Sequence, residues 1–196
     1  MSTVYTIGHS AHTYEEFAAL LASQRIEVVV DTRSAPYSRF APQFDREILQ
    51  RSLTLSGMKY LFLGVELGGR PGNSAYYDAE GHVLYSRITH DPAFVSAIQR
   101  VERGIAAFRV ALMCGEENPA HCHRRLLVGR VLAERGHRVM HIRAGAELQT
   151  DAEVAAASGK PLVNAQPALF AELDEDQWRS TASVSPKRAP ASSSVF

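Results

Sequence analysis

The sequence contains little cysteine and no excess of charge of either sign. Its two cysteines, Cys114 and Cys122, are too few for the disulfide framework of a small secreted protein. Lysine plus arginine and aspartate plus glutamate number 21 each, so the net charge is zero. This balance disfavours direct binding of nucleic acid through a broad basic surface, but it leaves a local basic patch open.

The sequence also lacks long apolar runs. None approaches the roughly 18 residues that a membrane span requires. The opening residues, MSTVYTIGHS, show neither the charged region nor the apolar region of a signal peptide. We therefore expect a cytoplasmic protein with reduced thiols and no membrane partner. The sequence does not indicate an oligomeric state.

What the chain does contain is an alternation of short apolar runs and amphipathic segments. Continuously apolar, β-branched runs predict buried strands over 3–8, 26–34, 59–69, 108–114 and 137–145. Apolar residues at helical spacing predict helices over 13–24, 46–57, 91–105 and 118–136. This alternation is typical of an α/β fold. We expect three layers, with a mostly parallel, Rossmann-like sheet of five strands flanked by helices.

The composition of the chain changes toward its C-terminus. We expect residues 1–178 to form one α/β domain. Residues 146–178 hold helical-looking pieces and one tryptophan, so they are candidates for a C-terminal extension that packs on this domain. Residues 179–196, RSTASVSPKRAPASSSVF, are rich in serine, alanine and proline, which predicts a disordered tail.

Polar and reactive residues gather where the predicted strands end. In open parallel sheets, ligands bind outside the carboxyl ends of the strands. In chain order, the residues at or after these ends are His9, Ser10, Asp31, Arg33, Ser38, Arg39, Gly68, Gly69, Cys114, Glu116, Cys122, His123 and Arg124. Because loops seldom concentrate histidine, cysteine, arginine and aspartate at one edge, we predict a functional site there.

These residue types suggest separate roles in binding and in chemistry. The arginines, Arg33, Arg39 and Arg124, suit bidentate binding of a phosphate or carboxylate, with Ser10, Ser38, Gly68 and Gly69 shaping the substrate site. Asp31 or Glu116 would act as general base or acid, and His9 or His123 would share the proton transfer. Each residue also has an ordinary structural explanation, such as a surface ion pair or a tight turn.

The segment ALMCGEENPAHCHRRLL, residues 111–127, holds both cysteines and admits three interpretations. In the first, Cys114 or Cys122 is a nucleophile, with its thiolate stabilised by a helix N-terminus and neighbouring cations. The Cys-x5-Arg pattern of phosphatases is absent, because residue 120 is alanine. In the second interpretation, both cysteines are buried as small apolar residues.

The third interpretation is a metal site. Cys114, His121, Cys122 and His123 offer four potential ligands for zinc or iron. However, the C-x7-C spacing is not a zinc-finger pattern, and adjacent residues on a helix point about 100° apart. We therefore assign no metal ligands from the sequence.

Four stretches in order resemble one known family. They are YTIGHS, VVDTRSAPYSR, YLFLGVELGG and LMCGEENPAHCHRRLL, between about Thr6 and about Ile142. They resemble the bacterial and archaeal family catalogued as domain of unknown function 488, although Thr32 replaces the valine expected in DVRS. The resemblance implies no particular reaction. It implies that the following residues stand at motif positions of the family: His9, Asp31, Arg33, Ser38, Arg39, Cys114, Glu116, Cys122, His123 and Arg124.

We therefore expect a cytoplasmic enzyme with a cleft at the strand ends. It would be a hydrolase or transferase acting on a phosphate-bearing small molecule, a nucleotide or a modified nucleic-acid component. The first alternative is a module that binds or senses a nucleotide-like ligand without turnover. The second alternative is a Cys/His metal-binding protein. For the enzyme and the sensor, the expected partner is a small anionic or nucleotide-like molecule.

Overall fold

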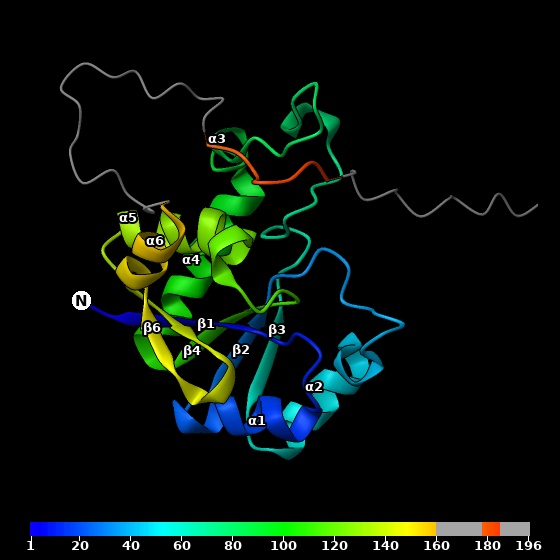
Figure 1. Ribbon diagram of the computed structural model, residues 1–196, viewed down its shortest axis with the longest axis vertical. Coiled ribbons are helices and arrows are strands. Elements are labelled where there is room, and N and C mark those ends of the chain that lie inside the picture. Colours follow the sequence, from blue (N-terminus) through cyan, green and yellow to red (C-terminus); the bar gives the residue numbers. More distant parts are fainter. Residues whose placement is uncertain (160–177, 185–196) are drawn as a thin grey trace, which may run out of the picture.

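The fold is built on one six-stranded sheet, seen in the computed structural model, which describes residues 1–159 and 178–184 (Figure 1). The strand order is β3-β2-β4-β1-β5-β6. The strands are β1 (Thr3–Gly8), β2 (Val28–Asp31), β3 (Lys59–Phe62), β4 (Val110–Cys114), β5 (Arg138–Ile142) and β6 (Leu148–Thr150). Strands β1 to β5 are parallel, and β6 pairs with β5 in the antiparallel direction. The expected mostly parallel α/β fold is confirmed, with one short edge strand added.

Helices cover both faces of this sheet. They are α1 (Tyr14–Ser23), α2 (Arg46–Leu55), α3 (Tyr85–Ile88), α4 (Pro92–Ala107), α5 (Arg130–Glu134) and α6 (Asp151–Ser158). The first of them begins at a capping box, in which Thr13 and Glu16 satisfy each other's backbone N–H groups. Among the described residues, no helix combines the length and the apolar character that crossing a bilayer would need.

Alternate residues of each strand enter two separate cores. Tyr5, Val29 and Met113 pack with the buried sides of α1 and α2. Val28 and Leu112 point to the other face, where α4 and α5 cover them. This division follows from the two-residue period of a strand, and it explains why the central strands are apolar throughout.

The predicted helix 118–136 is wrong in its first turn. Residues Pro119–His121 form a separate 3₁₀ turn, and Cys122 then has extended backbone angles, with φ −97° and ψ 138°. The helical segment starts after this break. It begins with a π-helical stretch at Arg124–Gly129 and continues as α5. The backbone N–H groups of the first helical turn donate to the Cys122 carbonyl oxygen. Cys122 and His123 therefore do not follow the helical rotation of about 100° per residue.

The predicted disordered tail starts too early at residue 179. Residues 178–184 lie beside α3 (Figure 1) and form a bridge between Leu84 and Arg179. The indole of Trp178 donates to the Leu126 carbonyl oxygen at 2.8 Å, and the Ser180 N–H donates to the Val83 carbonyl oxygen at 2.9 Å. Composition alone could not reveal these long-range bonds. The rest of the predicted tail, 185–196, and residues 160–177 of the predicted extension lie outside the described residues.

Candidate active site

A cavity of about 410 Å³ opens at the carboxyl ends of the parallel strands. We call it the strand-end cleft. The residues that line it are His9, Arg33, Ser34, Ala35, Tyr37, Ser38, Gly69, Arg70, Tyr85, Cys114, Gly115, Glu116, His121, His123, Ser180, Thr181, Ala182 and Val184. Seven of the residues proposed from the sequence are in this set: His9, Arg33, Ser38, Gly69, Cys114, Glu116 and His123. The structure therefore brings the ends of four strands to one cavity.

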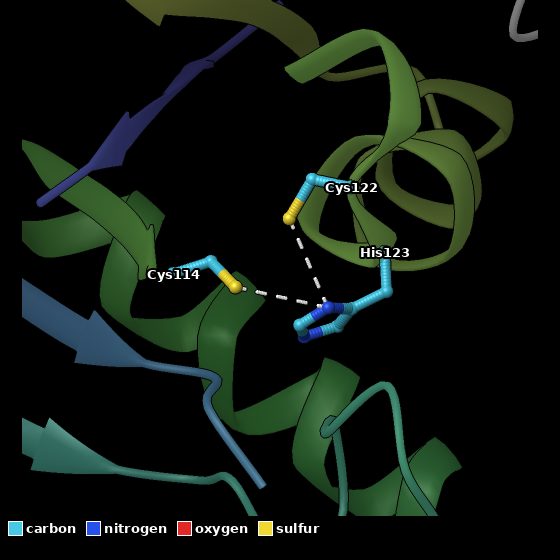
Figure 2. Close-up of side chains that lie close together, drawn as sticks. All are labelled: Cys114, Cys122 and His123. Atoms are coloured by element: carbon cyan, nitrogen blue, oxygen red, sulfur yellow. Dashed lines mark hydrogen bonds between the residues drawn. The ribbon is translucent and has the colours of Figure 1, made fainter. Parts of the chain in front are cut away.

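Two cysteines and a histidine lie together at the cleft, and we call them the sulfur cluster: Cys114, Cys122 and His123. Cys114 and His123 line the cleft, whereas Cys122 does not. The Nδ1 atom of His123 lies 3.8 Å from each cysteine sulfur. Figure 2 shows both sulfurs and Nδ1 pointing toward one another, with Cys114 coming from the end of β4. Cys114 is 7% exposed and Cys122 is 1% exposed. The extended backbone at Cys122 permits this convergence of neighbouring side chains.

The ring of His123 is fixed in one orientation. Its Nε2 atom lies 2.9 Å from the Thr32 carbonyl oxygen. A carbonyl oxygen only accepts hydrogen bonds, so Nε2 carries a proton and donates. Gly69 packs against the ring, where a Cβ atom would lie 2.7 Å from Cγ and Nδ1. These contacts direct Nδ1 at the two sulfurs.

The three groups of the sulfur cluster change each other's ionisation. Hydrogen bonding from Cys122 and the positive charge of His123 hold the pKa of Cys114 well below its usual value, although burial opposes this. Burial raises the pKa of Cys122 well above its usual value, as does the neighbouring Cys114. Burial would lower the pKa of His123, but the charge of Cys114 and the hydrogen bonds with Cys114 and the Thr32 carbonyl oxygen together outweigh it and raise the pKa. The apo cluster thus favours a Cys114 thiolate, a Cys122 thiol and a protonated His123.

A second polar network holds Arg33 on another side of the cleft. The guanidinium donates to both carboxylate oxygens of Asp31, with Nη2 lying 2.7 Å from Oδ2, and to the Phe44 carbonyl oxygen at 2.8 Å. Tyr60 also donates to Asp31 at 2.7 Å. Asp31 is fully buried and accepts all these bonds, so the expected role of general base does not fit it. Asp31 instead orients Arg33.

His9 also serves to orient Arg33. Its Nδ1 atom lies 2.9 Å from the Ser10 carbonyl oxygen and therefore donates, which leaves Nε2 to accept from Nη1 of Arg33 at 3.2 Å. Burial and the charge of Arg33 lower the pKa of His9, which favours this neutral form. The imidazole stacks on Phe44 with ring centroids 4.4 Å apart. With both ring nitrogens engaged, His9 does not fit the expected role of proton carrier.

Arg124 does not line the cleft and does not fit the expected role of anion ligand. Its side chain is fully buried. The guanidinium donates to the carbonyl oxygens of Glu116 and Glu117 and, through Nε, to Thr6 Oγ1 at 3.4 Å. Glu116 itself faces the cleft, and burial followed by the charge of Cys114 raises its pKa. Arg124 therefore positions the loop that carries Glu116.

Three further sequence-based candidates lie away from the cleft wall. Ser10 contributes its carbonyl oxygen to His9, and Gly68 packs against Ser34. Arg39 is exposed and lies over the Phe40 ring, 4.9 Å from its centroid. These three residues do not line the cleft, so the structure does not place them in contact with a substrate there. Ser38 does line the cleft, where its N–H donates to Asp45 at 2.8 Å.

Several residues that line the cleft have no role predicted from the sequence. Arg70 directly follows the glycine pair at the end of the third predicted strand, and this strand-end position is the signal that points to it. Ser34 accepts from the Arg70 N–H at 2.9 Å and belongs to the same DTRS stretch as Arg33. The cleft is also lined by Ser180, Thr181, Ala182 and Val184. No sequence pattern could identify these residues, because their position depends on a contact between distant parts of the chain.

Comparison with known proteins gives one positive result. The family model described as "Domain of unknown function DUF488" matches residues 13–131, a span that contains Arg33, Asp31 and the whole sulfur cluster but not His9. The YTIGHS stretch, which we also associated with the family, lies before this span. No curated protein and no solved structure is significantly similar to the chain. The family model covers more than half of the sequence, and the chain therefore belongs to the DUF488 family.

Proposed function

We propose that this chain is an enzyme, a hydrolase or transferase that acts in the strand-end cleft on a small substrate with a phosphate or another anionic group. The observation that carries the proposal is that the polar network around Arg33 and the sulfur cluster meet at one cavity. Arg33, held by Asp31 and His9, and the sulfur cluster with Glu116 both contribute residues to this cavity. Converging cationic and reactive groups in one cavity are typical of an active site.

Arg33 and Arg70 together would bind the anionic group of the substrate. The charge of Arg33 is balanced by the buried carboxylate of Asp31, which keeps the guanidinium rigid but reduces its net field. Arg70 is exposed at the same cleft, and its side chain has no acidic partner within residues 1–159 and 178–184. Arg70 therefore supplies the uncompensated positive charge that attracts an anion.

The reactive end of the cleft is the sulfur cluster with Glu116. Cys114 and His123 line the cavity next to Gly115 and Glu116. A thiolate in this centre can act as a nucleophile, or it can bind the group that does. A neighbouring carboxyl group can donate or accept a proton. Together they account for the cleavage or transfer of a group from the bound anion.

Binding is tested first, on the full chain. Inorganic phosphate, nucleoside monophosphates and sugar phosphates are titrated by calorimetry. We expect Arg70→Gln to weaken the binding of the best ligand about tenfold, since a charge-assisted hydrogen bond contributes about 1.5–3 kcal/mol. Arg100→Gln is the matched control, because Arg100 is an exposed arginine of α4 outside the cleft. Equal affinities for both variants would contradict the proposed anion site.

Turnover is tested on the same ligands by mass spectrometry. We expect the wild-type chain to convert at least one ligand and Glu116→Gln to slow this conversion at least about 100-fold while binding persists, the effect typical of a lost general acid or base. Binding without any product would overturn the enzymatic proposal and support the sensor module instead. Neither binding nor conversion would contradict both.

A further inference from the structure

We propose that Cys114, Cys122 and His123 bind one zinc ion at the wall of the strand-end cleft. The assignment of this ion to the reactive centre rests on the proposed function, whereas the metal site itself rests on the geometry of three side chains. The cluster joins the end of β4 to the start of the helical segment after Cys122 (Figure 2). Two thiolates and an imidazole are a donor set that zinc prefers.

The spacing of the donor atoms fits a tetrahedral ion. The two sulfurs and Nδ1 of His123 all lie within 4.8 Å of one another, and each sulfur lies 3.8 Å from Nδ1. With zinc bonds of about 2.3 Å to sulfur and about 2.1 Å to nitrogen, tetrahedral ligands of these kinds lie about 3.6 Å apart. The two sulfur-to-Nδ1 distances would therefore contract by only a few tenths of an ångström on metal binding, and the two sulfurs already lie within 4.8 Å of each other.

The histidine is oriented as a metal ligand is. In most metal sites, the imidazole nitrogen that does not bind the ion donates to a carbonyl or carboxylate oxygen, which fixes the ring and its tautomer. His123 donates through Nε2 to the Thr32 carbonyl oxygen at 2.9 Å, so the nitrogen that faces the sulfurs is the one free to coordinate. This bond is an observation independent of the donor spacing, and it points to the same use.

Charge and burial favour the same assignment. Cys122 and Cys114 are both buried. Zinc binding would release the protons of the Cys122 thiol and of His123 Nδ1, and the Cys114 and Cys122 thiolates would then balance the charge of the divalent cation. The loaded cluster would be close to neutral, which suits a site shielded from water. Two cysteines and one histidine leave one position of a tetrahedral ion for water or substrate, as in catalytic zinc sites. Cys114 and His123 line the cleft, which gives access to that position.

When bound, zinc would act as a Lewis acid at the reactive end of the cleft. The chain's own residues set the surroundings of the ion. Arg124 fixes the Glu116 loop from below, and Thr32 and Gly69 hold the ring of His123. Glu116 would face a molecule bound next to the cluster and could exchange a proton with it.

The test measures metal content in the full chain, purified without a histidine tag from zinc-supplemented medium. We expect about one zinc per wild-type chain, as one site requires, and almost none in Cys122→Ser and in His123→Asn. His121→Asn is the matched control, because His121 lies in the same segment and lines the cleft but is not part of the cluster. Circular dichroism verifies that each variant is folded.

Cobalt provides a second readout that does not depend on a variant. Replacing zinc by cobalt in the wild-type chain should give the intense near-ultraviolet absorption of thiolate-to-cobalt charge transfer, and a chelator should abolish it and lower the Tm. A reduced wild-type chain that takes up neither metal would overturn the inference, and so would folded ligand variants that retain zinc.

The metal inference and the proposed function can fail separately. Absence of zinc together with phosphate binding that depends on Arg70 would reject the metal site and leave the proposed function standing. Stoichiometric zinc without ligand binding or conversion would reject the proposed function and leave the metal site standing.

Discussion

The buried guanidinium of Arg124 donates to the carbonyl oxygen of Glu116, across the gap between the loop after β4 and the helical segment that follows Cys122. Its other Nη atom donates to the Glu117 carbonyl oxygen at 2.6 Å. One fully buried cation thus fixes both parts of the chain that contribute to the sulfur cluster. This relationship gives Arg124 a structural importance that a substrate ligand would not have.

Replacing Arg124 by methionine should destabilise the fold strongly. The variant leaves the carbonyl oxygens of Glu116 and Glu117 without their donor, and each unsatisfied group costs about 1–3 kcal/mol, so we expect a loss of about 3 kcal/mol or more in the free energy of unfolding. Urea denaturation measures this loss. Arg135→Met is the control, since Arg135 forms an exposed pair with Glu102 and should cost less than about 1 kcal/mol. Similar losses in both variants would contradict the assigned role.

Replacing Gly69 by alanine should disturb the sulfur cluster through His123. The added Cβ would lie 2.7 Å from Cγ and Nδ1 of the ring, so the ring must leave its present position beside the sulfurs. We expect zinc affinity, measured by competition with a chromophoric chelator, to fall about 10–100-fold, the range typical for lost support of a ligand. At Gly72 a Cβ would meet nothing within 4 Å, so Gly72→Ala should leave the affinity unchanged. Unchanged affinity in Gly69→Ala would show that the ring position is unimportant.

Asp151 should make the stability of the protein depend on pH in the acid range. Burial alone would raise the pKa of Asp151, but hydrogen bonds from His141 and Arg125 outweigh it and hold the pKa below the ordinary value of 3.8. A carboxyl group with a lowered pKa in the folded state stabilises the fold above its ordinary pKa and loses this effect as the pH falls through the lowered value.

We therefore expect Asp151→Asn to lower the free energy of unfolding by about 2 kcal/mol or more at pH 7, because it removes the carboxylate that pairs with the buried Arg125. The difference from wild type should shrink as the pH falls below 3.8. Urea denaturation across this pH range measures it. Glu134→Gln, which breaks a partly exposed pair with Arg130, should cost less than about 1 kcal/mol at every pH. A constant Asp151→Asn difference down to the acid limit would contradict the linkage.

Releasing the segment 178–184 should expose Cys114. Trp178 holds this segment by its bond to the Leu126 carbonyl oxygen and by the guanidinium of Arg130, which lies 4.1 Å from the centroid of its ring. We expect Trp178→Ala to speed the alkylation of Cys114 by iodoacetamide several-fold in reduced, metal-free protein, since access limits the reaction of a buried thiol. Peptide mass spectrometry measures the rate at this cysteine. The exposed Ser183 lies in the same segment, so Ser183→Ala should react like wild type. Equal rates in all three proteins would mean that the segment does not shield the cleft.

The sheet and the position of the site could be predicted from the sequence, because both depend on local patterns. Continuous apolar runs such as VVV in β2 and VALMC in β4 indicate parallel strands buried on both faces. Strand order then follows the ordinary rules for such sheets, so polar residues after different strands meet at one edge. His9, Arg33 and Cys114 were identified in this way, and all three line the cleft.

The roles of individual residues could not be predicted, because they depend on partners distant in sequence. Asp31 and His9 are the kinds of residue that move protons, but here Tyr60 and Arg33 occupy their hydrogen-bonding atoms. The sequence disfavours the metal-binding alternative because the C-x7-C spacing is not a zinc-finger pattern and because Cys122 and His123 are predicted to lie on a helix. One extended residue before the helix reverses that geometric objection. A backbone change confined to one residue leaves no periodic signal in the sequence.

The bonds that hold residues 178–184 against α3 have a practical consequence for anyone who shortens this chain. A protein trimmed after Trp178, where the composition predicts the tail to begin, would lack Ser180, Thr181, Ala182 and Val184, which line the strand-end cleft. Its sheet and its sulfur cluster could remain intact while its cavity became wider and less selective. A compound library screened against the trimmed protein would then report on a surface that the full chain does not present.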